Sequence, residues 1–316
     1  MSPLLDYLCN ALALGMTFLY GSTGEIITEK VGHLNLGIPG IMCMGGAGGC
    51  LALSALQSSG LPPFLIVIIG IVATFLSGAA MGALYSFLTV TLHANQNVTG
   101  LAMTTFGVGA TKFIMSKIKS YQYMYAIKHF RFPFADTTSS LQHWGVMFFL
   151  AIAVAILASL ILMRTKVGLH LRAVGENPAT ADAVGINVTA YKYGATCVGG
   201  GIAALGGIYY ILDYSGSPEA YLQIEALGWL AIALVIFALW KPYLSIFGSA
   251  LFGFLYVASS FLPGLLNLAL PQYATPLLKM LPYVVTILVL IISSVRKKRE
   301  NQPPASLGQS YFREER

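Results

Sequence analysis

Residues that could carry out catalysis are sparse in this chain of 316 residues. Its 12 Asp and Glu residues are expected almost entirely in loops and tails, with Glu225 alone near the edge of an apolar run. The chain holds no HExxH motif and no GxxxxGKS or GxxxxGKT loop to cradle a nucleotide phosphate, and no Ser-His-Asp arrangement stands out. Its four cysteines lack CxxC spacing and lie in apolar stretches, which indicates packing. The sequence therefore predicts no enzyme, no metal site and no cofactor bound by this chain.

Composition places the chain in a membrane. Only 9% of its residues are charged and 56% are hydrophobic, with a mean hydropathy of +0.73. A soluble domain carries about a quarter charged residues, because polar groups must cover its surface. These values exclude an ordinary soluble protein, a disordered chain and a disulfide-stapled secreted fold. The 33 glycines fit a membrane protein, since small residues let lipid-embedded helices approach closely.

About nine apolar runs are long enough to span a bilayer, so we expect an all-α transmembrane bundle over residues 1–295. The expected spans are 4–22, 38–58, 63–91, 95–115, 144–163, 189–212, 225–240, 243–262 and 278–295. The segment between the fifth and sixth spans is rich in Lys and Arg, which favours the cytoplasm. An odd number of spans then places the N-terminus outside and a basic, polar tail, 296–316, inside. The cluster Arg296, Lys297, Lys298 and Arg299 indicates a charge anchor at the membrane edge, and we expect no nucleic-acid partner.

One long segment on the outer side, 116–143, breaks the positive-inside pattern. Its candidate docking residues are Lys117, Lys119, Lys128 and Arg131. Three interpretations remain open: the span count is wrong by one, the charges face an acidic partner protein, or the segment lies on anionic membrane lipid.

A short helix is predicted within the cytoplasmic segment 164–190, at about 177–184. Asn177 is a suitable N-cap, Pro178 suits the first helical position, Asp182 lies in the early turns and Gly185 suits a left-handed stop. Such a short helix is marginal alone in water. Its caps therefore indicate docking into a groove of another protein, with a plain interhelical loop as the alternative.

The chain also lacks an evident energy source. It has no nucleotide loop, and no carboxylate is expected at mid-membrane to bind a driving ion. The simplest interpretation is a transport subunit driven by a partner. The alternatives from another class are a stand-alone passive channel and an ion-coupled carrier.

Four stretches carry a resemblance to a known family. GLHLRAVGENPATADAVGINV and GGGIAALGGIYY resemble the cytoplasmic loop and next helix of bacterial binding-protein-dependent ABC importer permeases. EIITEKVGHLNLGIPGIMCMGG (25–46) and LTVTLHANQNVTGLAMTTFGVGAT (88–111) resemble the nucleoside-type members of that class. The class serves branched-chain amino acids, ribose-like sugars and nucleosides. His33 and the basic outer segment depart from the usual pattern, and these departures leave the substrate open.

The resemblance implies one subunit of a larger machine in the bacterial plasma membrane. Its partners would be a second related permease, an ATPase with two nucleotide-binding cassettes that holds the ATP and Mg²⁺, and an extracellular substrate-binding lipoprotein. The short helix would be the coupling helix seated on the ATPase. The implied coupling residues are Gly175, Glu176, Asn177, Pro178, Asp182 and Gly185.

A nucleoside pathway should offer aromatic faces with scattered hydrogen-bonding groups. The candidates are Asn35, Asn97, Thr105, Phe106, Glu225 and Trp229. Competing roles are equally open. Amides near a span edge often act as caps, Thr105 can bond back to its own helix, and Trp229 can anchor at the interface.

Overall fold

The computed structural model describes residues 3–137, 140–265, 274–296 and 302–312, and the regular structure in these residues is entirely helical. The helices are α1 (Pro3–Lys30), α2 (Ile38–Leu56), α3 (Pro63–Ser86), η1 (Phe87–Thr91), α4 (Gln96–Lys117), α5 (Tyr121–Met124), α6 (Ile127–Phe130), η2 (Ser140–His143), α7 (Val146–Arg164), α8 (Lys166–Glu176), α9 (Pro178–Ala183), α10 (Val188–Ile208), η3 (Tyr209–Ser215), η4 (Ala220–Gln223), α11 (Ile224–Phe237), α12 (Pro242–Leu265), α13 (Ala274–Lys279) and α14 (Leu281–Arg296). The predicted all-α membrane bundle is confirmed.

Eight helical stretches in the described residues are long and apolar enough to span a membrane, and they overlap the first eight predicted spans. The ninth predicted span, 278–295, coincides with a shorter apolar stretch, Pro276–Val289. The exact number of crossings stays a prediction. Lys297, Lys298 and Arg299 of the proposed charge anchor lie outside the described residues.

The expected placement of carboxylates was wrong at three positions. Helix α1 continues to Lys30, well beyond the predicted end at residue 22, and therefore contains Glu25 and Glu29, both buried. Asp213 is buried in η3, which continues α10. A search for apolar runs ends a span at the first charged residues, whereas burial against other helices lets the helix continue through them.

Helix α10 packs among α1, α2 and α3 because glycines remove side chains from the contact surfaces. A Cβ on Gly24 of α1 would lie 2.2 Å from the carbonyl oxygen of Gly199, and one on Gly78 of α3 would lie 2.4 Å from that of Gly200. Both distances are shorter than a van der Waals contact. Glycines of α10 therefore take part in the close helix packing that the glycine content predicts.

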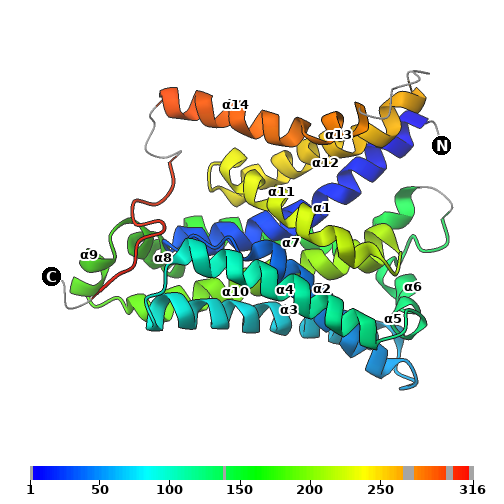
Figure 1. Ribbon diagram of the computed structural model, residues 1–316, viewed down its shortest axis with the longest axis horizontal. Helices are drawn as coiled ribbons and strands as arrows, with labels where there is room; N and C mark the ends of the chain where they lie inside the picture. The colour runs from blue at the N-terminus through cyan, green and yellow to red at the C-terminus, as the bar shows by residue number, and fades with distance from the viewer. Residues whose placement is uncertain (1–2, 138–139, 266–273, 297–301, 313–316) are drawn as a thin grey trace.

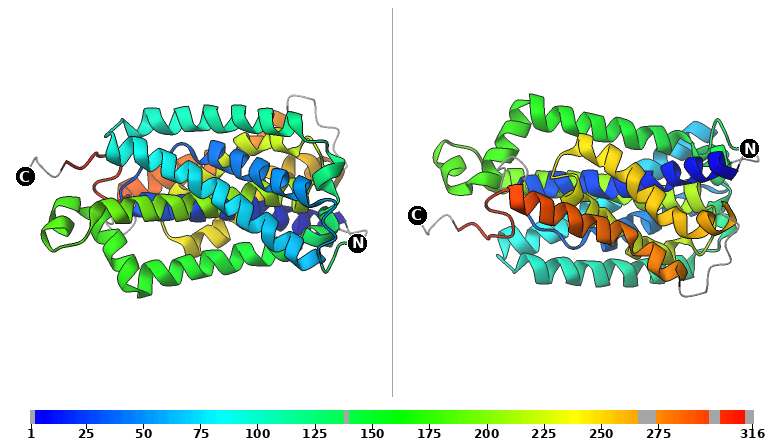
Figure 2. Two further views of the ribbon diagram at one scale, coloured as in Figure 1. Left: turned by 90° about the horizontal axis from the view of Figure 1, so that it is seen from below. Right: turned by 90° about the horizontal axis from the view of Figure 1, so that it is seen from above.

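The two candidate partner-binding regions lie at opposite ends of the bundle (Figures 1 and 2). Helices α5 and α6 of the outer segment lie at the end where α1 begins. Helices α8 and α9 and residues 302–312 lie at the other end, which we call the α9 end. This arrangement agrees with an odd number of crossings, while the orientation of the bundle in the membrane stays a prediction.

The segment 164–190 contains more helix than the sequence predicts. Residues Lys166–Glu176 form α8, which begins where the Thr165 hydroxyl oxygen accepts a hydrogen bond from the Gly168 N–H at 3.1 Å. Helix α9 follows after Asn177, and α10 begins at Val188. Helix α8 was not among the predicted elements, although its Thr165 cap is visible in the sequence.

Candidate functional site

Helix α9 has a closed structure at both ends. At its start, the side-chain oxygen of Asn177 accepts a hydrogen bond from the Thr180 N–H at 3.0 Å, and Pro178 occupies the first turn. At its end, Gly185 has a φ of +87°, its N–H donates to the Asp182 carbonyl, and the Ile186 N–H donates to the Ala181 carbonyl, both at 3.0 Å. This pair of bonds is the Schellman arrangement. The capped short helix predicted from the sequence is present.

The two faces of α9 differ in burial. Ala181 is 3% exposed and packs in a cluster of buried apolar residues that also contains Val174 of α8 and Val188 of α10. On the other side, Ala179, Thr180 and Ala183 are exposed, and Val184 is 71% exposed. Small, largely uncharged side chains on a rigid projecting helix suit a close protein contact.

The α8–α9 junction is held against α1. Gly175 is buried, and a Cβ at this position would lie 2.2 Å from the Lys30 carbonyl oxygen. Glu176, the next residue, is exposed. Gly175 therefore fixes the position from which α9 projects, while Glu176 lies on the surface beside the helix.

Residues 302–312 form what we call the C-terminal strap, which crosses the α9 end. The Ser306 N–H and hydroxyl both donate to the Gly175 carbonyl, at 3.0 and 2.6 Å, and the Gly308 N–H donates to the Gly32 carbonyl at 3.1 Å. The Gln96 side-chain amide donates to the Gln309 carbonyl at 3.2 Å. The sequence predicts only a polar tail here, because none of these partners is local.

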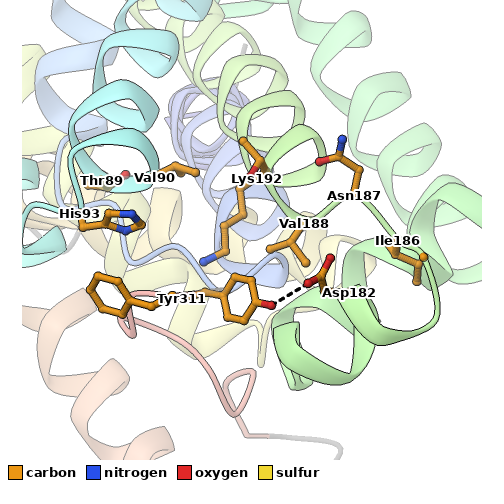
Figure 3. A pocket seen from close by; sticks show the side chains of 12 residues that line it. Thr89, Val90, His93, Asp182, Ile186, Asn187, Val188, Lys192 and Tyr311 are labelled. Carbon is orange, nitrogen blue, oxygen red and sulfur yellow. Dashed lines mark hydrogen bonds between the residues drawn. The ribbon is translucent and has the colours of Figure 1, made fainter. Parts of the chain in front are cut away.

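The strap also binds α9 itself. The Tyr311 hydroxyl donates to a carboxylate oxygen of Asp182 at 2.9 Å, drawn as a dashed line in Figure 3. Asp182 was proposed from sequence as a coupling residue on the basis of resemblance. The structure gives it a definite contact within the chain, between α9 and the strap.

The six predicted pathway residues lie in three separate places. Asn35 is buried in the connection between α1 and α2, where its N–H donates to Glu25 Oε1 at 3.1 Å and its Oδ1 accepts from the Gly37 N–H at 2.9 Å. Glu225 and Trp229 are half-buried on α11. Both contacts of Asn35 shape this connection, so its role in the structure is at least partly local.

The other three pathway candidates are exposed residues of α4. Asn97 is exposed next to the cap formed by Asn95, the Thr105 hydroxyl donates back to the Leu101 carbonyl at 3.1 Å, and Phe106 is 55% exposed. Asn97 and Phe106 are nine residues apart, which places them on opposite sides of the helix, so the three candidates do not form one lining.

Only three of the four docking candidates are exposed: Lys117, Lys119 and Lys128, which we call the outer lysines. Arg131 is half-buried, and its guanidinium donates to the carbonyls of Asp213 and Tyr214 at 2.8 and 3.2 Å and to Gln142 Oε1 at 3.3 Å. Arg131 satisfies carbonyls at the end of η3, which gives it a structural role, and its part in docking stays a prediction.

Two further carboxylates at the α9 end were missed by sequence reasoning. Glu29 accepts a hydrogen bond from the indole N–H of Trp240, and Glu25 accepts one from Asn35. Their spacing of four residues within EIITEK places both on one helix face, and this is the signal that could have found them. They join α1 to the start of α2 and to the end of α11.

A bundle of long apolar helices with a capped helix at one end is the architecture of a multi-pass membrane protein. The chain belongs to the family described as "Branched-chain amino acid transport system / permease component", whose model matches residues 7–290. It is therefore the permease component of an ABC transporter and acts together with other components.

Three relatives are similar over nearly their whole length. The putative glucose ABC transporter permease protein TsgC13 of Haloferax volcanii is 31% identical over 97% of this chain and 98% of its own. The nucleoside ABC transporter permease protein NupC of Lactococcus lactis is 30% identical over 90% of both chains. The guanosine ABC transporter permease protein NupQ of Bacillus subtilis is 30% identical over 84% of this chain and 85% of its own.

Proposed function

We propose that this chain is the permease subunit of an importer that moves nucleosides inward, with energy from ATP hydrolysed on a partner ATPase. The observation that carries the proposal is the capped helix α9, with one face packed on the bundle and the other exposed. The similarity to two nucleoside-type permeases over most of the chain supports the substrate class. ATP and Mg²⁺ bind to the partner, and this chain binds no cofactor.

The geometry suits a lever. Helix α9 is connected through α8 to α7 on one side and directly to α10 on the other. Movement of α9 by closing ATPase cassettes would tilt these two helices, and α10 packs among α1, α2 and α3. The strap and the Gly175–Lys30 contact would transmit the same movement to the α1–α2 connection. Alternating access to the two sides of the membrane then follows from a rigid-body change.

Three partners complete the proposed machine. A second, related permease would cover exposed faces such as that of α4, and an ATPase with two cassettes would hold α9. An extracellular binding lipoprotein would contact the outer lysines through acidic groups, which contribute more to encounter rate and register than to affinity. Coupling would involve Gly175, Glu176, Asn177, Pro178, Asp182 and Gly185.

A sugar is the second candidate substrate, because a putative glucose permease is 31% identical to this chain. The two substrates differ in what the pathway must offer, since a nucleoside has a flat base that can stack on an aromatic ring. Phe106, whose aromatic ring is 55% exposed on α4, supports the nucleoside.

Uptake by the reconstituted transporter tests the proposal. Proteoliposomes with all subunits are given ATP and labelled guanosine, glucose or leucine. ATP-dependent uptake of guanosine alone is the expected result, and Asn97→Ala and Phe106→Ala should slow it at unchanged expression. Uptake of glucose or leucine instead would overturn the substrate. Uptake by this chain without the ATPase would overturn the mechanism in favour of a channel or carrier.

A further inference from the structure

A cavity of about 690 Å³ lies at the α9 end, beside the proposed coupling helix. Its walls come from η1 and His93, from Asp182 of α9, from the α9–α10 connection with the first turns of α10, and from the end of the C-terminal strap (Figure 3). This volume falls within the range of about 300–1,000 Å³ that is usual for small-molecule sites. Neither the pathway nor the exposed face of α9 uses this cavity.

The main feature of the cavity is a buried lysine. Lys192 is 3% exposed, and its side chain extends from α10 so that the ammonium group points into the cavity (Figure 3). Within the described residues its ammonium group has no hydrogen-bond or ion-pair partner. A buried charge without a partner is costly, so a cavity that holds one is suited to an anion.

A second feature points to the same chemistry. The cavity is lined by the first residues of α10, a helix of 21 residues capped by Asn187. Asn187 accepts from the Ala190 N–H at 2.9 Å, which leaves the amides of Val188 and Thr189 without intrahelical acceptors. The positive end of the helix dipole and the Lys192 ammonium therefore act on the same space.

The opposite wall is aromatic. The rings of His93 and Phe312 lie 4.5 Å apart between centroids, and Tyr311 lines the cavity next to them. His93 has a φ of +54°, a left-handed conformation that is uncommon for a residue other than glycine. Flat rings of this kind can stack on a heterocyclic base.

One group in the lining is negative. Asp182 lies across the cavity from His93, with Lys192 between them (Figure 3), and its Oδ2 accepts from the Tyr311 hydroxyl. A carboxylate repels a phosphate but accepts hydrogen bonds from sugar hydroxyls. The lining thus offers a phosphate position at Lys192, with the ring of His93 on one side of it and the carboxylate of Asp182, which suits hydroxyls, on the other.

We propose that this cavity binds a nucleoside monophosphate, with the phosphate on Lys192 and the α10 amides and the base against His93 and Phe312. The binding site is inferred from the residues that line the cavity. The effect of binding on uptake depends also on the proposed nucleoside import. A phosphorylated nucleoside is what a phosphoryl-transfer reaction makes from an imported one. Binding it would hold Tyr311 and Phe312 of the strap in place beside α9, and so restrain the coupling helix and slow uptake.

Binding to the assembled transporter in lipid nanodiscs tests the site without any transport. The probes are guanosine monophosphate, guanosine and inorganic phosphate, each measured by calorimetric titration. We expect the monophosphate to bind the most tightly of the three. Lys192→Gln should weaken its binding by about tenfold to a hundredfold, because a charge-assisted contact is lost. Lys192→Arg, which keeps the charge, should retain most of the affinity.

Two controls make the result decisive. Lys166→Gln removes an exposed charge of α8, which does not line the cavity, and should leave monophosphate binding unchanged. Two carboxylates of the chain itself, Glu314 and Glu315, follow Phe312 in the sequence and are a competing source of negative charge. Their joint change to Gln should also leave the affinity unchanged, whereas binding that appears only in this variant would overturn the proposal.

The remaining outcomes are equally clear. No binding of the monophosphate, equal binding of inorganic phosphate, or unchanged binding in Lys192→Gln would each overturn the site. Monophosphate enclosed on the α9 side of proteoliposomes should slow guanosine uptake in the wild type and not in Lys192→Gln. If uptake proves specific for a sugar, the proposed function fails while the binding result still decides the site.

Discussion

Removing the N-cap of α9 is the sharpest test of the lever, and Asn177→Ala does so with one small change. The lost bond is the 3.0 Å contact from the Thr180 N–H. Loss of an Asn cap costs about 1 kcal/mol, with a range of about 0.5–2 kcal/mol. Helix α9 has only six residues, far below the roughly 12–15 needed for marginal stability alone, so it has little other local support.

The expected effect is partial. The Schellman bonds at Gly185 and Ile186 and the Tyr311–Asp182 contact remain, so α9 should fray at its start and stay attached at its end. A loss of about 1 kcal/mol lowers the population of the intact helix by about fivefold if that population is limiting. ATP-driven uptake in proteoliposomes should fall by a similar factor.

The matched control is Asn95→Ala, which removes the same type of cap from α4. Asn95 accepts from the N–H groups of Asn97 and Val98 at 3.0 and 3.1 Å, but α4 has 22 residues and stays folded without it. Equal uptake in the two variants, at equal expression, would refute the reasoning. Adding Asp182→Lys to Asn177→Ala should abolish uptake and leave solute binding by the isolated lipoprotein intact.

Three further predictions address the other contacts. Tyr311→Phe should make amide hydrogen exchange in the strap roughly tenfold faster, because a bond to a carboxylate contributes about 1.5 kcal/mol or more; exchange equal to the wild type would contradict this. Changing the outer lysines to Glu should abolish salt-sensitive docking of the lipoprotein, whereas Arg131→Gln should instead lower the melting temperature, since its carbonyl partners lose their donors. Burial lowers the pKa of His143 from 6.5 to about 4, so the folded protein resists protonation there. Its contribution to stability should be complete above pH 6.5 and be lost as the pH falls toward 4, and the melting temperature of His143→Gln should depend less on pH in this window.

The local features of the fold and site were predictable. Long apolar runs predicted the first eight membrane-spanning helices. The residue types at positions 177, 178 and 185 (Asn177, Pro178 and Gly185) predicted the capped helix α9. Each depends on hydrogen bonds or hydropathy within a few residues of sequence. The extension of α1 through Glu25 and Glu29 was not predictable in this way, because helices distant in sequence bury these carboxylates.

The sequence also did not predict which of several basic side chains forms hydrogen bonds within the fold. Arg131 and the outer lysines are all basic and belong to the same segment, yet only Arg131 reaches the carbonyls at the end of η3, 82 and 83 residues away. The six pathway candidates share suitable chemistry but lie at three places in the bundle. Which of two similar groups is buried is set by packing rather than by residue type.

The sequence by itself determined that this protein is a helical membrane bundle with a short capped helix, because hydropathy and capping act over a few turns of one chain segment, and its resemblance to ABC importer permeases indicated the class. Only the tertiary structure decided that the polar tail is a strap, that Asp182 is bound by Tyr311, and that Lys192 points into a cavity. The strap contacts join positions 129 and 131 residues apart, and their formation depends on how the bundle brings the ends of its helices together.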